Sequence, residues 1–256
     1  MSRFLLGLQN GIIYGPVNSR RLGSSLGLNI LPIEYKACPF NCIYCQYGFT
    51  LHEGYVIDSD GRNMPKVHQV AMALEAGLKA NPDVAYVTFS GNGEPTLHPH
   101  FTDIVTEVKK IKERLVPNAR LAILSNSAFV WKREIRETLS RLDVCFMKLD
   151  AGYRELFIKF NRPHRDINFD DIVAGLKQLQ GVIIQALFAG GDNGNYNDYA
   201  IDRWVETIGQ IRPAGCHIYS LDRGTPDDNL TVIDQDGLLR IKQLTEERTG
   251  IPVEVF

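Results

Sequence analysis

Apolar residues recur along most of the chain at two spacings, and the two spacings alternate. Val70, Leu74 and Leu78 stand four residues apart, which predicts a helix over 66–80. Polar residues and a proline end this helix, and an almost continuous apolar run then predicts a strand over 84–89. Residues 66–89 are therefore predicted to form a helix, a turn and a buried strand.

The same alternation continues toward the end of the chain. Strands that alternate with helices form parallel sheets through right-handed crossovers. The sequence therefore predicts an α/β fold, a partial (β/α)6 TIM-like barrel with six parallel strands. We expect strands at 28–33, 84–89, 120–124, 144–149, 182–188 and 216–221, and further helices at 101–115, 132–142, 169–179, 199–211 and 235–248.

A chain of 256 residues is long enough to bury the core of one such barrel. We expect a single domain over 1–256. Within it, residues 1–27 are expected to form an N-terminal extension, 28–222 the barrel core, and 223–256 a C-terminal helix and tail.

Composition and charge narrow the class of protein. The formal net charge of −2 gives no overall cationic field of the kind that attracts nucleic acid. The five cysteines cannot all pair, which favours a reducing compartment and metal chemistry over a disulfide framework. No apolar run approaches membrane-spanning length. We therefore expect a soluble cytoplasmic protein with no membrane partner.

Polar motifs follow the expected strands at the point where each strand ends. In a parallel barrel, the carboxyl ends of the strands and the loops after them form one rim. We therefore expect these motifs to lie together. In chain order they are the cysteine run that begins at Cys38, the segment 91–95, Ser125 with Asn126, Lys148 with Asp150, Gln185, and Asp222 with Arg223.

Three of the cysteines, Cys38, Cys42 and Cys45, are clustered with no fourth cysteine nearby. Thiolates favour iron–sulfur clusters or zinc, and three of them leave one metal position open for a reacting ligand. The alternative is a structural zinc site completed by His52. Cys145 and Cys216 stand alone in apolar strands, so we interpret them as buried core residues.

The spacing Cys38-x3-Cys42-x2-Cys45, with Tyr44 before the last cysteine, resembles the signature of the radical S-adenosylmethionine (SAM) superfamily. This resemblance implies a [4Fe–4S] cluster on the three thiolates, with SAM bound at the remaining iron. An electron from the cluster then cleaves SAM to give a 5′-deoxyadenosyl radical. It also implies that Tyr44 contacts the adenine, for which packing within the loop is the alternative.

The segment after the second strand resembles the glycine-rich motif of the same superfamily. Gly91, Asn92, Gly93 and Glu94 match it, with Asn92 in the place of one glycine. Glycines let a ligand approach the backbone, and the Glu94 carboxylate suits the methionine ammonium. Read by itself, such a segment is usually a turn.

Polar residues at the ends of later strands resemble the remaining SAM contacts of the superfamily. Asn126 and Asp150 suit the ribose hydroxyls, with Ser125 beside them, and Lys148 suits the carboxylate. Helix capping by Ser125 and Asn126, and a surface ion pair for Lys148, are the alternatives. Gln185 either faces the barrel lumen and the cofactor or is a hydrogen-bonded core amide.

Within the superfamily, the chain most resembles the wyosine-related iron–sulfur oxidoreductases. The resemblance lies in segments 14–29, 161–164 and 221–223. Charged residues in these segments are candidates for binding an anionic group of the substrate, because guanidinium groups recognise phosphate and carboxylate. An ordinary surface position is the alternative for each. The candidates are Arg20, Arg21, Arg162, His164 and Arg223. Asp222, beside Arg223, is a further candidate for contacting the substrate.

The resemblance predicts a radical SAM enzyme that acts on an unidentified small molecule, peptide or RNA. It also implies a low-potential electron donor, flavodoxin or ferredoxin. Three alternatives stay open: an activase that installs a glycyl radical on a partner enzyme, a tRNA-modifying enzyme, and a zinc or iron–sulfur binding module without turnover.

Overall fold

The computed structural model describes residues 4–19, 21–51, 54–57 and 60–256. Its central feature is an eight-stranded sheet in the order β1-β2-β3-β4-β5-β6-β8-β10. All neighbouring strands run parallel except β1, which is antiparallel to β2. The strands are β1 (Ile13–Ser19), β2 (Gly23–Leu28), β3 (Tyr86–Phe89), β4 (Arg120–Ser125), β5 (Val144–Lys148), β6 (Ile183–Leu187), β8 (Gly215–Tyr219) and β10 (Val253–Val255).

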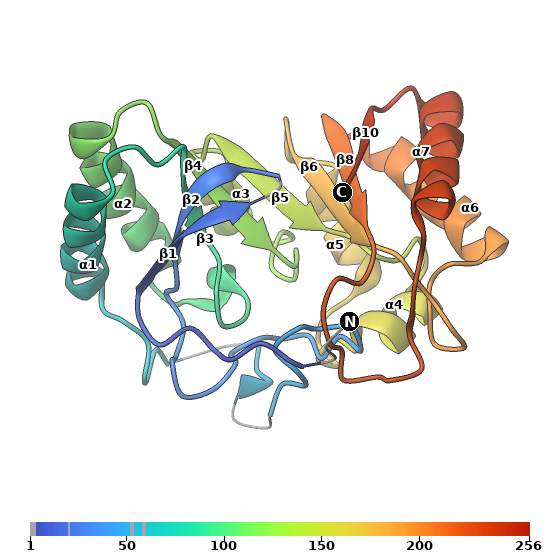
Figure 1. Cartoon of the computed structure of the whole chain (residues 1–256), viewed down its shortest axis with the longest axis horizontal. Helices are drawn as coiled ribbons and strands as arrows, with labels where there is room; N and C mark the ends of the chain where they lie inside the picture. Colours follow the sequence, from blue (N-terminus) through green and yellow to red (C-terminus); the bar gives the residue numbers. More distant parts are fainter. Residues whose placement is uncertain (1–3, 20, 52–53, 58–59) are drawn as a thin grey trace.

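The sheet curves into an incomplete ring with helices on its outer side (Figure 1). Helices α1 and α2 cover one flank and α6 and α7 the other. A separate antiparallel pair joins β7 (Ala189–Gly190) to β9 (Thr231–Val232). The helices are α1 (Val67–Ala80), α2 (Phe101–Leu115), α3 (Arg133–Leu139), α4 (Arg154–Asn161), α5 (Phe169–Leu176), α6 (Asp198–Ile211) and α7 (Gln235–Thr249), and one 3-10 turn, η2, spans Pro95–Leu97.

The predicted partial (β/α)6 barrel is confirmed, with β2, β3, β4, β5, β6 and β8 as its six parallel strands. The position of the first strand differs: it is Gly23–Leu28 and not 28–33. Strands β1 and β2 pair as a hairpin and belong to the sheet, although residues 1–27 were expected to form an extension. At the other end, the expected tail contributes β10, which pairs with β8.

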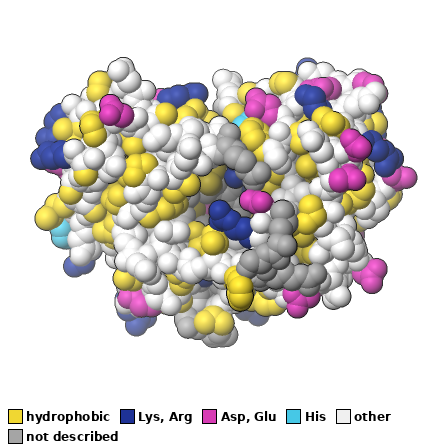
Figure 2. Space-filling view, in the orientation of Figure 1, with side chains coloured by type: hydrophobic (Ala, Val, Ile, Leu, Met, Phe, Trp, Pro, Cys, Tyr) yellow, Lys and Arg dark blue, Asp and Glu magenta, His cyan; other side chains and the backbone are white. Residues whose placement is uncertain are grey.

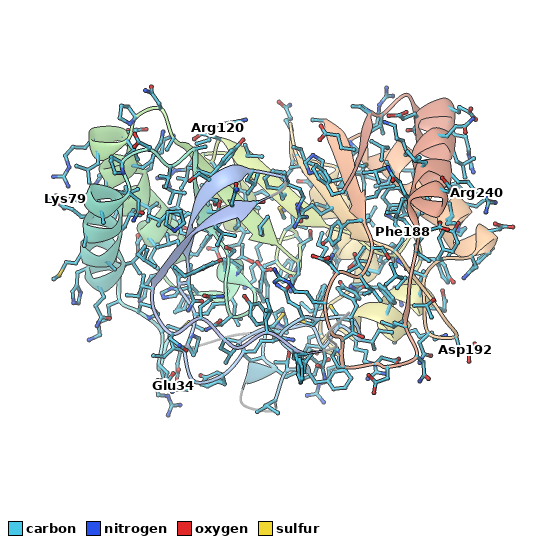
Figure 3. All side chains as sticks on the ribbon, in the orientation of Figure 1. Glu34, Lys79, Arg120, Phe188, Asp192 and Arg240 are labelled. Carbon is cyan, nitrogen blue, oxygen red and sulfur yellow. The ribbon has the colours of Figure 1, made fainter. Side chains whose placement is uncertain are left out.

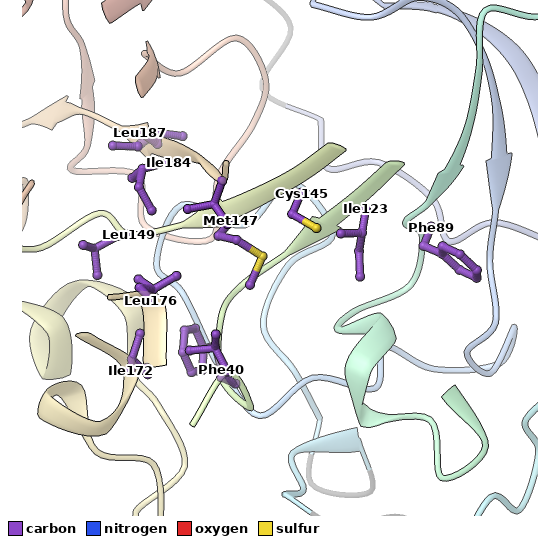
Figure 4. Close-up of a cluster of buried hydrophobic side chains, with 14 of the residues drawn as sticks. Phe40, Phe89, Ile123, Cys145, Met147, Leu149, Ile172, Leu176, Ile184 and Leu187 are labelled. Carbon is purple, nitrogen blue, oxygen red and sulfur yellow. The ribbon is translucent and has the colours of Figure 1, made fainter. Parts of the chain in front are cut away.

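Side chains alternate between the two faces of the sheet. The outer face packs against the helices, where Cys145 and Met147 of β5 lie among apolar side chains (Figure 4). Cys145 and Cys216 are both buried free thiols, as predicted. Inside the ring, a small apolar cluster of Ala122, Val144 and Phe146 forms a floor.

The polar candidates lie beyond this floor, toward the carboxyl ends of the strands. Arg120, at the amino end of β4, and Glu34, in the loop after β2, lie at opposite edges of the molecule (Figure 3). The loops on the Glu34 side carry the cysteine run. Among the described residues, no helix is long and apolar enough to cross a membrane.

Candidate active site

A cavity of about 500 Å³ opens at the carboxyl ends of the parallel strands. Figure 2 shows the hollow in the middle of this face, with Lys or Arg side chains and an acidic side chain at it. Residues from both ends of the chain meet here. The predicted site residues that line the cavity are Arg21, Cys38, Cys42, Tyr44, Cys45, Gly91, Gly93, Ser125, Asn126, Lys148, Gln185, Asp222 and Arg223.

The cysteine loop is held by backbone hydrogen bonds to segments on both sides of it. Cys38 N–H donates to the Gly54 carbonyl at 2.9 Å, and Ile43 N–H donates to the Phe160 carbonyl at 3.1 Å. Within the loop, Cys45 N–H donates to the Cys42 carbonyl at 3.2 Å. The three thiols are therefore presented from a fixed backbone.

Each of the three sulfurs accepts a hydrogen bond from a different side chain. Asn126 Nδ2 donates to Cys38 Sγ at 3.3 Å, and Asn161 Nδ2 lies 3.5 Å from Cys42 Sγ. Lys36 Nζ donates to Cys45 Sγ at 3.3 Å. Such donors stabilise anionic sulfur, the form that binds iron.

Without a bound cluster, burial opposes the ionisation of Cys38 and Cys42. It raises the pKa of Cys38 to about 12 and the pKa of Cys42 to about 11. Iron coordination replaces the thiol proton, so the pair would become thiolates on binding a cluster. The donors described above would then compensate the buried negative charge.

Lys36 is the cation that faces the three cysteines. It is 6% exposed, and its Nζ also donates to the Gly48 carbonyl at 2.8 Å. Burial alone would lower its pKa, but the charges of Cys45, Cys38 and Cys42 outweigh burial, and the pKa is raised. The ammonium therefore stays charged beside the sulfurs.

The donor set fits the thiolates of an iron–sulfur cluster. Among the described residues, no group of three His, Cys, Asp or Glu side chains could hold a single metal ion. His52, the fourth ligand of the zinc alternative, lies outside the described residues.

The glycine-rich loop after β3 packs directly on the cysteine loop. Ala37 N–H donates to the Asn92 carbonyl at 2.9 Å, and Glu94 N–H donates to the Ala37 carbonyl at 3.0 Å. A Cβ on Gly93 would lie 1.8 Å from the Ala37 carbonyl oxygen. Only glycine permits this approach, so the two loops are fixed side by side.

Asn92 lies in this loop, but its side chain is turned away from the cavity and fully buried. Its Nδ2 donates to the carbonyls of Gln9, at 3.0 Å, and Pro32, at 2.8 Å. Its Oδ1 accepts from Gln9 N–H at 2.8 Å. The Asn92 side chain therefore connects the glycine-rich loop to the segments at Gln9 and Pro32 by hydrogen bonds and does not face the cavity.

Glu94 joins the loops after β3 and β4. Its Oε1 accepts from Thr96 Oγ1 at 2.5 Å and from Ser125 Oγ at 2.8 Å. Its Oε2 accepts from Asn126 N–H at 2.6 Å. Burial raises the pKa of Glu94, and these hydrogen bonds oppose that effect. The carboxylate lies directly behind the cavity wall, and its contact with the methionine ammonium stays a prediction.

Asp150 is the centre of a buried polar network beside Tyr44. Asp150 Oδ2 accepts hydrogen bonds from Tyr44 Oη and, at 2.8 Å, from Asn161 Nδ2. Its Oδ1 accepts from Leu187 N–H at 2.8 Å and pairs with Lys148 Nζ at 3.0 Å. The network fixes Tyr44 at the cavity wall, close to the cysteine loop.

Lys148 faces the cavity between two partners. Its Nζ donates to Tyr219 Oη at 2.8 Å and pairs with Asp150. Burial would lower the pKa of Lys148, but Asp150 and Tyr219 outweigh it and raise the pKa above its usual range. Lys148 is therefore cationic at the wall.

Two predicted substrate contacts are not brought to the cavity. Helix α4 ends at Arg162 in a left-handed conformation, and the Arg162 guanidinium lies 5.3 Å from the ring of Phe49. His164 pairs with Asp166 and packs near Tyr55. Pro163 pairs with Phe40, so this segment supports the cysteine loop from outside. Arg20, a third candidate, lies outside the described residues.

A model of the radical SAM superfamily matches residues 35–205, more than half of the chain. The match includes the cysteine loop, the glycine-rich loop and the Asp150 network. The chain belongs to the radical SAM superfamily. Enzymes of this superfamily use a [4Fe–4S] cluster and SAM, so the predicted enzyme class and both cofactors are confirmed at the level of the family.

Relatives of this radical SAM chain include longer proteins. A protein named GTPase Obg from Brachyspira hyodysenteriae is 27% identical over 248 residues, which cover 95% of this chain and 35% of that protein. A UPF0026 protein of Methanocaldococcus jannaschii is 28% identical over 212 residues, covering 81% of this chain and 62% of that protein. The chain thus spans less than two thirds of both.

A solved structure of TYW1 with a lysine–pyruvate adduct bound resembles this radical SAM chain in fold. The TM-score is 0.64 at 16% sequence identity, with 88% of this chain and 74% of that chain covered. The likeness confirms the partial-barrel fold.

Three residues of the site in this radical SAM chain were not predicted from its sequence. Lys36 could have been noticed as a cation two positions before the first cysteine. Asn161 lies in a segment that carried the family resemblance, yet its contact with Cys42 depends on how α4 packs. Tyr219, whose hydroxyl accepts from Lys148, has no local signal, because it ends a strand as an ordinary aromatic residue.

Proposed function

We propose that this chain cleaves SAM reductively and that the resulting radical takes a hydrogen atom from a substrate at the open side of the barrel. The observation that carries the proposal is the loop of three thiols, each with its own N–H donor, on the wall of the cavity. A [4Fe–4S] cluster bound there would supply the electron that breaks the carbon–sulfur bond of SAM.

Cys38, Cys42 and Cys45 are the residues that would hold this cluster. The loop offers three thiols, so one iron is left for the amino and carboxylate groups of SAM. Lys36, Asn126 and Asn161 would stabilise the thiolates through the hydrogen bonds already in place. The protein thus compensates the buried charge of the sulfurs before any substrate arrives.

The glycine-rich loop and Lys148 would position the methionine end of SAM. Gly91 and Gly93 line the cavity without side chains, so the ligand can lie against their backbone. Glu94 would accept from the ammonium, and the cationic Lys148 would pair with the carboxylate.

The nucleoside end would lie along the wall formed by β4 to β6. Asn126 and Asp150 would bind the ribose, with Ser125 as a neighbour, and the ring of Tyr44 would contact the adenine. Gln185 lines the same wall from β6. A low-potential flavodoxin or ferredoxin would deliver the electron, and hydrogen abstraction by the radical would yield 5′-deoxyadenosine.

The test is anaerobic reconstitution of Cys42→Ala with iron and sulfide. We expect this variant to lose the brown colour of the cluster and to form no 5′-deoxyadenosine from SAM under dithionite, because a ligand to iron is gone. The matched control is Cys145→Ala, which removes a buried thiol in β5 that faces helices and not the cavity. The control should keep both colour and product. Product formation by Cys42→Ala at the control rate would refute the proposal.

A further inference from the structure

The cavity carries two arginines that the proposed handling of SAM does not use. Lys36 faces the sulfurs and Lys148 pairs with Asp150, so both cations near SAM have counterparts. Arg21 and Arg223 line the cavity as well. No ion pair joins either arginine to a carboxylate within the described part of the chain.

Arg21 is held in place by the tip of the β1–β2 hairpin. Ser19 Oγ accepts hydrogen bonds from Arg21 N–H at 3.3 Å and Leu22 N–H at 3.2 Å, which fixes the backbone of the tip. The next side chain, Leu22, packs on Val144 and Phe146 in the floor of the barrel. The hairpin tip thus carries Arg21 inward over the floor.

The guanidinium of Arg21 reaches across the opening and lies 4.7 Å from the ring centroid of Tyr219. Its Nη1 is buried and has no hydrogen-bond partner among the described residues. Only two other buried side-chain polar atoms in the described chain share that state. A buried donor of a charged group costs free energy when it is left unsatisfied, so an atom of this kind indicates a missing partner.

Arg223 lines the cavity from the loop after β8. Its Nη1 donates to Gln46 Oε1 at 3.0 Å. Gln46 directly follows Cys45, so this contact places Arg223 beside the cysteine loop. Asp222, which also lines the cavity, has an interaction of its own and is not a free counterion.

We propose that Arg21 and Arg223 bind an oxyanion of the substrate, a carboxylate or phosphate group of a small molecule. The inference rests on the proposed function, because it names the substrate class of the same cavity. A guanidinium stacked on a ring keeps N–H groups at its edge, and these match the two oxygens of a carboxylate or phosphate. The oxyanion would accept hydrogen bonds from the guanidinium groups that line the cavity.

The experiment measures anion binding directly. Reconstituted enzyme with SAM is titrated with inorganic phosphate and, separately, with acetate at constant ionic strength, by calorimetry. We expect Arg21→Gln to weaken binding of the preferred anion at least about tenfold, since charge-assisted hydrogen bonds are lost. The stronger of the two anions identifies the substrate group as phosphate or carboxylate.

Two further variants keep the result interpretable if Arg21→Gln folds poorly. Arg21→Lys retains the charge but loses the paired N–H donors of the guanidinium, so it should bind the anion more weakly than wild type. Arg223→Gln should also weaken binding of the anion. The matched control is Arg133→Gln, an exposed arginine that pairs with Glu137 on α3, and it should bind as wild type does.

Equal affinity in wild type and all three cavity variants, or no binding of either anion to wild type, would overturn the inference. This outcome is separate from failure of the proposed function, which is decided by 5′-deoxyadenosine formation in the cysteine variants. Anion binding needs no turnover, so it is measured in either case.

Discussion

Lys36 shows how one side chain sets the electrostatics of the cysteine loop. It is almost fully buried, and its ammonium is held between Cys45 Sγ and the Gly48 carbonyl. Reduction of a cluster adds a negative charge close to this ammonium. A nearby cation stabilises that charge, so Lys36 should raise the reduction potential.

We predict that Lys36→Gln shifts the reduction potential of the reconstituted cluster to a more negative value. Glutamine keeps a donor for the Gly48 carbonyl but removes the charge. The measurement is a redox titration followed by electron paramagnetic resonance. Lys110→Gln, an exposed lysine paired with Glu107, is the control and should leave the potential unchanged. A potential that stays the same or rises in Lys36→Gln would show that the ammonium does not act on the cluster.

Some single residues of the site could be predicted from the sequence, and others could not. The cysteines and the glycine-rich motif were found because their spacing is local. The outward position of Arg162 was not found, because it depends on the left-handed end of α4. The structural role of Asn92 was missed for a similar reason, since its partners Gln9 and Pro32 are distant in sequence.

At the level of elements, most helices and the central strands were predictable, but α4 and the first strand were not. The predicted helix over 101–115 agrees with α2 because its apolar residues recur at helical spacing. Strand β2 contains Gly23, Ser24, Ser25 and Gly27, residues with low strand propensity. Its pairing with β3 defines it as a strand, and pairing has no local sequence signal.

The close contact between the cysteine loop and the glycine-rich loop can be tested by adding a Cβ at Gly93. We predict that Gly93→Ala destabilises the protein by about 3 kcal/mol and impairs cluster assembly, because the new Cβ would collide with the Ala37 carbonyl. Thermal unfolding and iron content are the measurements.

The control for this prediction is a glycine of positive φ whose added Cβ would collide with nothing. Gly181 also has a positive φ, 69°, but a Cβ there would meet nothing within 4 Å. Gly181→Ala should therefore cost only about 1 kcal/mol, from the backbone conformation alone. If both variants lost the same stability, the close packing of the two loops would not be what requires glycine at position 93.

On the scale of the whole molecule, Leu22 connects the hairpin at one edge of the sheet to the floor at its centre. We predict that Leu22→Ala lowers the free energy of unfolding by about 2 kcal/mol and also weakens binding of the anion, because the hairpin tip positions Arg21. Chemical denaturation and the phosphate titration measure the two effects. Leu239→Ala, on an exposed part of α7, should change neither. If Leu22→Ala lost stability but bound the anion with unchanged affinity, the packing of Leu22 would not be what positions Arg21.

The ring of strands stops at β1 on one side and β10 on the other, and the cavity touches Val17 of the first edge and Phe256 beside the second. Among the described residues, no strand pairing joins β1 to β10, and the guanidinium of Arg21 stacks on Tyr219 between the two sides of the opening. A cation–π contact is worth about 1 kcal/mol, less than twice the thermal energy. Thermal motion can therefore break and re-form the Arg21–Tyr219 contact at the cavity while the sheet stays intact.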